Sequence, residues 1–161
     1  MQVRTMSWAA GSALALAIVF VLYGPEQAAR ADQHGKVAEE RSKLMKGMGG
    51  AMRTLNGFVK GNKSAEEAAG AAAVIAASAP KIANVFPPNT GMGANPESEA
   101  KDDIWEEWDA FTAAASLLGD KAATLEAALA SGDAGAAAAA FGDLGKNGCG
   151  GCHSRFRDKR N

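Results

Sequence analysis

The chain has 161 residues, which is room for a single domain with a hydrophobic core of its own. Hydrophobic residues make up 47% of the sequence but aromatic residues only 6%, and this alanine-rich composition, poor in β-branched residues, favours helices over strands. The formal net charge of -1 gives no sign of the basic surface of a nucleic-acid-binding protein. We therefore expect an all-α protein without a nucleic-acid partner.

The N-terminal segment has the composition of an export signal. Arg4 and the free amine precede an uncharged apolar run, Trp8 to Tyr23, which is shorter than the about 20 residues of a membrane span. Residues 29–31 then read Ala-Arg-Ala, an A-x-A cleavage pattern. We predict that residues 1–31 are a signal peptide, or an uncleaved anchor, and that residues 32–161 form an exported domain with no other membrane contact.

Two helices are predicted in the first half of this domain. From Gln33 to about Lys60, apolar residues recur three and four positions apart and form one stripe. The stripe contains Met45, Met48, Met52, Leu55 and Val59. Ser64 and Glu67 have the spacing of a capping box that opens the second helix, which Pro80 should kink or end.

Two more helices follow a long loop rich in proline and glycine, residues 87–101. The third helix begins near Asp102, although Gly119 weakens its continuity by about 1 kcal/mol relative to alanine. After a turn, Asp133 is the predicted N-cap of the fourth helix, which continues to Phe156. Four helices with short connections and one long crossover predict an antiparallel four-helix bundle.

Both cysteines of the chain stand close to its C-terminus, together with one of its two histidines. They are Cys149, Cys152 and His153, separated as Cys-Gly-Gly-Cys-His, so on a helix all three share one face. Two thiols at this spacing can each add to a vinyl group of haem, and the adjacent histidine can then bind the iron. The motif therefore predicts one covalent haem c, attached through both cysteines, with His153 as an iron ligand.

Other roles for these residues fit less well but stay open. A redox-active dithiol of the thioredoxin type needs a βαβ setting that this chain lacks, although export would permit a Cys149–Cys152 disulfide. A structural zinc site needs four ligands, and beyond the motif the chain offers only His34 and scattered carboxylates. No Ser/His/Asp set or pair of carboxylates can be argued, so we do not expect an enzyme.

Four stretches of the sequence resemble the class II cytochromes c, the cytochrome c′ family. The stretches are ERSKLMKGMGGAM at 40–52, VFPPNTG at 85–91, DIWEEWDAF at 103–111 and CGGCHSRFRDK at 149–159. Their order and spacing extend the resemblance over residues 33–159. It implies a periplasmic four-helix bundle with one covalent haem, which exchanges electrons with redox partner proteins and can form a homodimer through its first two helices.

The resemblance also identifies candidate residues on the face of the haem opposite His153. Arg41 resembles a partner of a haem propionate, and the position four residues later, Met45, is where low-spin members of the family place a methionine ligand. An apolar side chain at this position instead leaves the iron five-coordinate and open to gases such as NO and CO. We predict a His153/Met45-ligated one-electron carrier, with gas binding as the alternative; Met48 is the second candidate ligand, and core packing is the other role for these methionines.

Aromatic residues of the third helix, namely Trp105, Trp108 and Phe111, are predicted to form core, with one of them at the haem edge. Phe156 should pack beside the haem, and His34 should be solvated. The chain ends in a basic stretch that suits the negative pole of the last helix. This stretch contains Arg155, Arg157, Lys159 and Arg160.

Overall fold

The structure, a computed structural model, describes residues 12–159, with side chains from Glu26 on. Arg4 and Trp8 of the predicted leader, and Arg160 of the basic end, lie outside the described residues. The helices are α1 (Ser12–Val59), α2 (Ala65–Ser78), α3 (Asp103–Glu106), α4 (Trp108–Ala130), α5 (Ala134–Asp143) and α6 (Gly150–Phe156). Two short 3-10 helices, Ala79–Lys81 and Ala83–Val85, follow α2, and a π-helical segment, Leu144–Cys149, joins α5 to α6.

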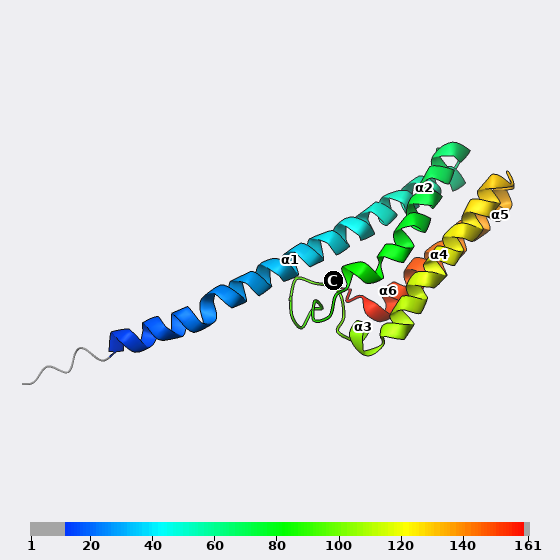
Figure 1. Ribbon diagram of the computed structural model, residues 1–161. Coiled ribbons are helices and arrows are strands. Elements are labelled where there is room, and N and C mark those ends of the chain that lie inside the picture. Colours follow the sequence, from blue (N-terminus) through cyan, green and yellow to red (C-terminus); the bar gives the residue numbers. More distant parts are fainter. Residues whose placement is uncertain (1–11, 160–161) are drawn as a thin grey trace, which may run out of the picture.

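Helices α1, α2, α4 and the α5–α6 stretch pack as a four-helix bundle in which successive helices run in opposite directions (Figure 1). Helix α1 contacts α2, α2 contacts α4, and α4 contacts α5. Residues 12–159 contain no strand, only an isolated bridge between Ala100 and Arg157. The predicted all-α four-helix bundle is therefore confirmed.

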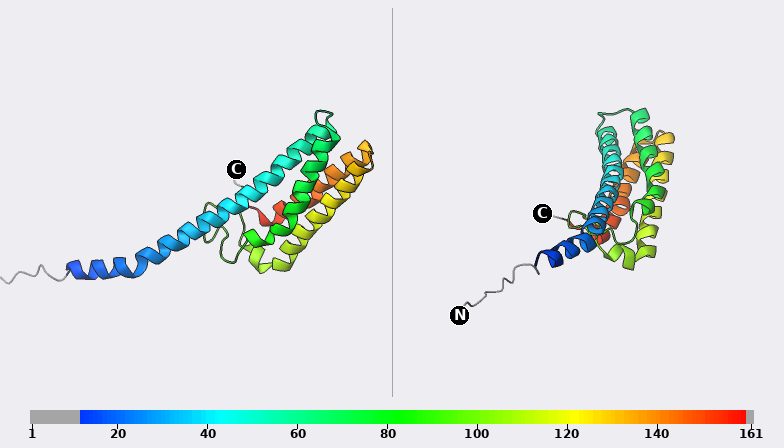
Figure 2. Two further views of the ribbon diagram at one scale, coloured as in Figure 1. Left: turned by 45° about the horizontal axis from the view of Figure 1, so that its top comes forward. Right: turned by 60° about the vertical axis from the view of Figure 1, so that its left-hand side comes forward.

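Helix α1 is longer than predicted. The sequence predicted a first helix from Gln33 to about Lys60, whereas α1 begins at Ser12, and its N-terminal half extends beyond the bundle (Figure 2). The added residues are rich in alanine and leucine, which have high helix propensity. Cleavage after Ala31, inside α1, stays a prediction. No helix within residues 12–159 is long and apolar enough to cross a membrane.

The predicted helix caps are confirmed. The backbone N–H of Glu67 donates to Ser64 Oγ at 3.1 Å, and the backbone N–H of Ser64 donates to Glu67 Oε2 at 2.8 Å. Asp133 caps α5 by accepting a hydrogen bond from the backbone N–H of Ala136 at 2.9 Å. Pro80 lies in the 3-10 helix that follows α2, so α2 ends where the sequence predicted.

The predicted third helix is interrupted at Glu107, where φ of -118° and ψ of 42° leave the helical region and separate α3 from α4. The preceding loop explains the separate direction of α3. Trp105 Nε1 donates to the carbonyl oxygen of Phe86 at 3.1 Å, and the Asp102 carboxylate accepts from the backbone N–H of Gly93 at 3.0 Å. Gly119 does not interrupt α4.

The core is centred on Phe111, which is 1% exposed. Its ring lies 4.7 Å from that of Phe86, 5.5 Å from that of Trp108 and 5.4 Å from that of Phe156, measured between centroids. Trp105 and Trp108 are half-buried and pack against the same core, as predicted. This aromatic cluster joins α4 to α6 and to the loop before α3.

We expect Ser64→Ala to lower the free energy of unfolding by about 1 kcal/mol. The change removes the hydroxyl oxygen that accepts from the Glu67 N–H, and with it the reciprocal pair of hydrogen bonds that makes the capping box. Urea unfolding followed by circular dichroism measures this change. Thr124→Ala is the control, since its hydroxyl is exposed and donates only to the Asp120 carbonyl oxygen within α4. Equal stability of the Ser64→Ala variant and the wild type would contradict the prediction.

Candidate haem-binding site

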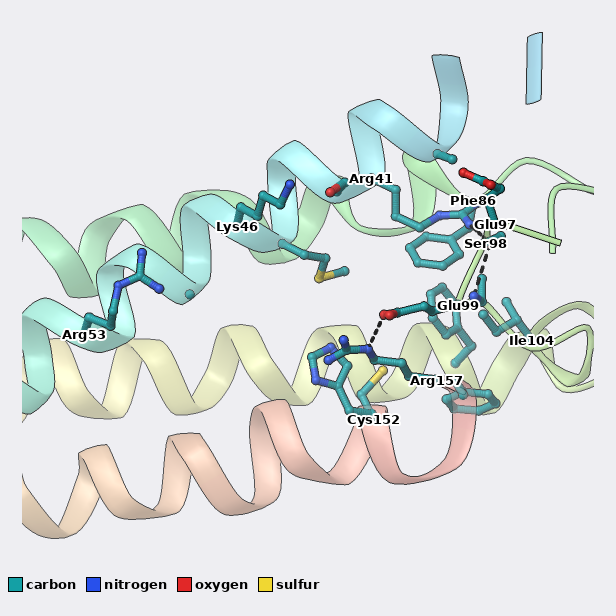
Figure 3. A pocket seen from close by; sticks show the side chains of 18 residues that line it. Arg41, Lys46, Arg53, Phe86, Glu97, Ser98, Glu99, Ile104, Cys152 and Arg157 are labelled. Atoms are coloured by element: carbon teal, nitrogen blue, oxygen red, sulfur yellow. Dashed lines mark hydrogen bonds and ion pairs between the residues drawn. The ribbon is translucent and has the colours of Figure 1, made fainter. Parts of the chain in front are cut away.

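A cavity of about 790 Å³ lies between α1 and α6. Its volume is within the range of small-molecule and cofactor sites, about 300 to 1,000 Å³. Figure 3 shows Arg41, Lys46 and Arg53 on α1 at one side of the cavity, and Cys152 and Arg157 on the opposite side. The loop before α3 and the core residues Ile104, Phe111 and Phe156 complete its wall.

The structure brings most of the predicted site residues to this cavity. Arg41, Met45, Cys152 and His153 line it together. Cys149 does not line it; this residue is half-buried one turn earlier and packs against the core. The individual roles of these five residues in holding haem and iron stay predictions.

The three methionines of the predicted apolar stripe, Met45, Met48 and Met52, differ in position. Met45 is the only methionine among the described residues that line the cavity. Met48 is 6% exposed and belongs to the core, and Met52 is half-buried against the core. The arrangement therefore favours Met45 over Met48 as the side chain that faces His153 across the cavity.

A π-helical segment positions the cysteine motif, so the prediction of one continuous fourth helix is wrong. The backbone N–H of Gly150 donates to the carbonyl oxygen of Gly145, five residues earlier, so the helix is wider just before Cys152. Gly148 is buried in this segment, and a Cβ atom there would lie 3.0 Å from Leu118 Cδ1 of α4. Wide helical turns of this kind are frequent at functional sites. In the sequence, the run of glycines around the cysteines was the available signal for an irregular helix at this point.

Arg41 is a buried cation at one end of the cavity. Its side chain is 8% exposed, and the Phe86 ring centroid lies 4.0 Å from its Cζ atom. Its guanidinium donates hydrogen bonds to the Val85 carbonyl oxygen at 3.1 Å, to Ser98 Oγ at 3.1 Å, and to both the carbonyl oxygen and Oγ1 of Thr90, at 3.3 and 2.9 Å. Burial lowers the pKa of Arg41 to about 10, which still leaves it charged at neutral pH.

All of these acceptors are neutral, and none of the ion pairs in the described part of the chain includes Arg41. A buried charge without a countercharge is costly. The rest of the cavity lining also carries a positive net charge. It contains three basic side chains, those of Lys46, Arg53 and Arg157, and two acidic ones, those of Glu97 and Glu99. The cavity therefore fits a ligand with two carboxylates, as haem has in its propionates.

Burial sets the protonation of the motif residues. It lowers the pKa of His153, and the positive charge of Arg157 lowers it further, so the imidazole is neutral, which is the form that binds a metal. Burial raises the pKa of Cys149, and raises the pKa of Cys152 to about 11 with a further contribution from the neighbouring Cys149. Redox-active Cys-x-x-Cys pairs have lowered thiol pKa values, so these cysteines do not resemble a dithiol oxidoreductase site.

The alternative of a structural zinc site is not supported, because residues 12–159 contain no group of three or more His, Cys, Asp or Glu side chains that could hold a metal ion. His34 is half-buried rather than fully solvated; its Nδ1 lies 3.4 Å from the carbonyl oxygen of Ala94. One imidazole and two thiols beside a large, positively charged cavity are a donor set suited to a covalently attached haem.

Fold and site together define a class II c-type cytochrome. The family described as cytochrome c′ matches residues 36–157. The chain belongs to this family, and its cofactor is a covalently bound haem c.

Named relatives agree with this assignment. Cytochrome c-556 of Agrobacterium fabrum is 38% identical over 122 residues, 76% of this chain and 81% of the relative. Cytochrome c-554 of Cereibacter sphaeroides is 36% identical over 149 residues, 90% of this chain and 96% of the relative. A solved cytochrome c′, described as having an unusual ligand-controlled dimer dissociation, superposes with a TM-score of 0.70 and 28% identity over 78% of this chain and 97% of its own.

Several residues of the site were missed from the sequence. Ser98 and Glu99 come from a loop without periodicity, and Lys46 and Arg53 read as ordinary solvated charges on a helix. The hydrogen bonds of Ser98 and Glu99 to Arg41 and Arg157 join positions 57 and 58 residues apart. The only signal in the sequence for this wall of the cavity was the family-like stretch at residues 85–91. It contains Val85 and Thr90, which accept hydrogen bonds from Arg41.

We expect Arg41→Lys to lower the free energy of unfolding of the holoprotein by about 2 kcal/mol, because an ammonium group cannot make the same branched set of hydrogen bonds. Arg53→Lys is the matched control, because Arg53 is exposed and makes no hydrogen bond or ion pair with any described residue. Urea unfolding measures both variants, and limited proteolysis of residues 87–101 reports on the loop. Equal losses in the two variants would contradict a special role for Arg41.

Proposed function

We propose that the protein is a periplasmic one-electron carrier whose single haem c is attached to Cys149 and Cys152 and ligated by His153 and Met45. The observation that carries this proposal is the placement of one methionine, Met45, in the lining of the cavity that also contains Cys152 and His153. Met/His ligation is an established arrangement for cytochromes, and it raises the reduction potential.

Each residue has a separate task in this proposal. Bound haem supplies an iron that changes between the ferric and ferrous states, which is the one-electron chemistry of the protein. Cys149 and Cys152 fix the group covalently, and His153 provides a neutral imidazole nitrogen, consistent with its lowered pKa. Met45 would provide a thioether sulfur as the second iron ligand. Arg41 provides positive charge for a propionate inside the cavity.

This arrangement suits electron transfer better than gas binding. If both His153 and Met45 bound the iron, then oxygen, NO and CO would have to displace a protein side chain before they could bind. The two ligands come from different helices, α1 and α6, which are both packed into the bundle. Such fixed positions keep the structural change between oxidation states small. Larger redox proteins would then be the donor and the acceptor, and the protein would not be an enzyme.

The proposed location and assembly have their own support. The predicted leader, residues 1–31, would direct the chain to the periplasm, where c-type cytochromes of this family are generally found. A homodimer is part of the proposal because one similar solved cytochrome c′ is described by its dimer dissociation. The outer face of α2 is rich in alanine and exposes Val74, which is 46% exposed, so close approach of a second copy is sterically feasible.

The alternative function is that of a five-coordinate cytochrome c′ that binds NO or CO. One observation favours it: a solved cytochrome c′ that superposes on this chain is described by its ligand-controlled dimer dissociation. In that case Met45 would cover the open iron position without binding to it. The two functions differ in one property that can be measured, which is the ease with which CO binds to the ferrous protein.

Met45→Leu keeps the volume of the side chain but removes the sulfur, so we expect it to lower the reduction potential and to let CO bind at least about tenfold more tightly. Met48→Leu is the matched control on the same helix, and we expect it to leave both quantities unchanged and to alter stability by less than about 1.5 kcal/mol. Redox titration and CO titration of the ferrous holoproteins measure these effects. If the Met48 variant changed and the Met45 variant did not, Met48 would be the ligand.

A further inference from the structure

The segment of residues 85–101, which we call the strap, connects the two sides of the cavity. Its neighbouring residues Ser98 and Glu99 contact different helices (Figure 3). Ser98 Oγ accepts a hydrogen bond from Arg41 of α1 at 3.1 Å. Glu99 Oε2 accepts one from Nε of Arg157, directly after α6, at 2.7 Å. Two consecutive residues thus join the helix of Met45 to the helix of His153.

On the side of α6, the strap also binds through its backbone. The N–H of Asp158 donates to the carbonyl oxygen of Glu99 at 2.8 Å, and the N–H of Lys101 donates to the carbonyl oxygen of Phe156 at 3.0 Å. The N–H of Arg157 in turn donates to the carbonyl oxygen of His153 at 3.3 Å and closes the last turn of α6. The strap is therefore attached to the turn that begins at His153.

On the side of α1, the attachment is buried. Arg41 lies one helical turn before Met45, and all four of its hydrogen bonds go to strap residues. Residues 97–100 of the strap also line the cavity itself. The separation between Met45 and His153 is therefore set by two routes, the packed core of the bundle and the strap.

We propose that Glu99 is a positioning residue, which holds the His153 turn of α6 at a fixed distance from α1 and so keeps Met45 within reach of the iron. This inference rests on the proposed His153/Met45 ligation. Ligands from two separate helices can bind one iron only while the distance between the helices stays within a fraction of an ångström. Loosening the strap at Glu99 would weaken the Met45 bond first, because a thioether is the weaker ligand, and would open the position to CO.

The expected effect is moderate. The side chains of Arg157 and Glu99 are 48% and 42% exposed, and an ion pair with such exposure contributes little by itself. We therefore expect Glu99→Gln to lower the dissociation constant for CO about two- to fivefold without abolishing Met45 ligation. Hydrogen exchange at the amides of Arg157 and Asp158 should become faster in the same variant, because both residues are held by Glu99.

The matched control is Glu107→Gln. This change also removes one negative charge and breaks one ion pair with the C-terminal part of the chain, the pair between Glu107 and Arg155. Glu107 connects Arg155 to the start of α4, whereas Glu99 connects Arg157 to the strap. We expect this variant to bind CO as the wild type does. The double exchange Glu99→Arg with Arg157→Glu restores the ion pair with reversed polarity, and should return CO binding and amide exchange toward wild-type values.

Three results would overturn the proposal: equal CO affinity of the Glu99→Gln and wild-type holoproteins, equal effects of the Glu99→Gln and Glu107→Gln changes, or no recovery in the double exchange. Faster amide exchange with unchanged CO affinity would reduce Glu99 to a purely structural role. If the wild-type protein itself binds CO as readily as the Met45→Leu variant, the proposed function fails separately. The amide exchange of Glu99→Gln then decides alone whether Glu99 positions the His153 turn.

Discussion

The burial of the Arg41 guanidinium is the interaction on which the site depends. A charged group inside a protein must have its N–H donors satisfied, and in this chain the acceptors come from one irregular segment, residues 85–101. The same segment is also held by Trp105 and Asp102 on one side and by Phe156 and Asp158 on the other. Arg41 thus attaches an already bonded loop to α1, and that loop forms one wall of the cavity.

The same charge explains the chemistry of the cavity. None of the ion pairs among the described residues includes Arg41, so in the proposed function a haem propionate would supply its countercharge, and the excess of basic side chains in the cavity lining would act in the same direction. On the opposite wall, the π-helical segment and its buried glycine bring α6 close to α4 and present Cys152 and His153 to the cavity. The bundle thus places α1, which carries Arg41 and Met45, opposite α6, which carries Cys152 and His153.

Local features of the sequence predicted much of this. The Cys149-to-His153 motif, the capping box at Ser64 and the N-cap at Asp133 each depend on residues within one or two helical turns, and such short-range patterns are visible without a fold. The apolar stripe that contains Met45 likewise follows from helical periodicity. The periodicity does not distinguish the methionines of this stripe, but the structure does: Met45 lines the cavity, whereas Met48 is in the core.

Other features could not be predicted because they depend on contacts between distant residues. The break at Glu107 follows from loop contacts that fix Trp105 and Asp102, and the links made by Ser98 and Glu99 connect positions 57 and 58 residues apart. Neither has periodicity or a motif. The π-helical segment Leu144–Cys149 packs its buried Gly148 against α4, and helix propensity does not describe such a contact.

The most direct test of the account is the absorption spectrum of the wild-type holoprotein, recorded in the ferric and ferrous states with and without CO. Ligation by His153 and Met45 predicts a low-spin spectrum in both states, with a methionine-to-iron band in the ferric form and little change on addition of CO. A high-spin spectrum that shifts readily with CO would contradict it, and would assign the protein to the gas-binding members of the family.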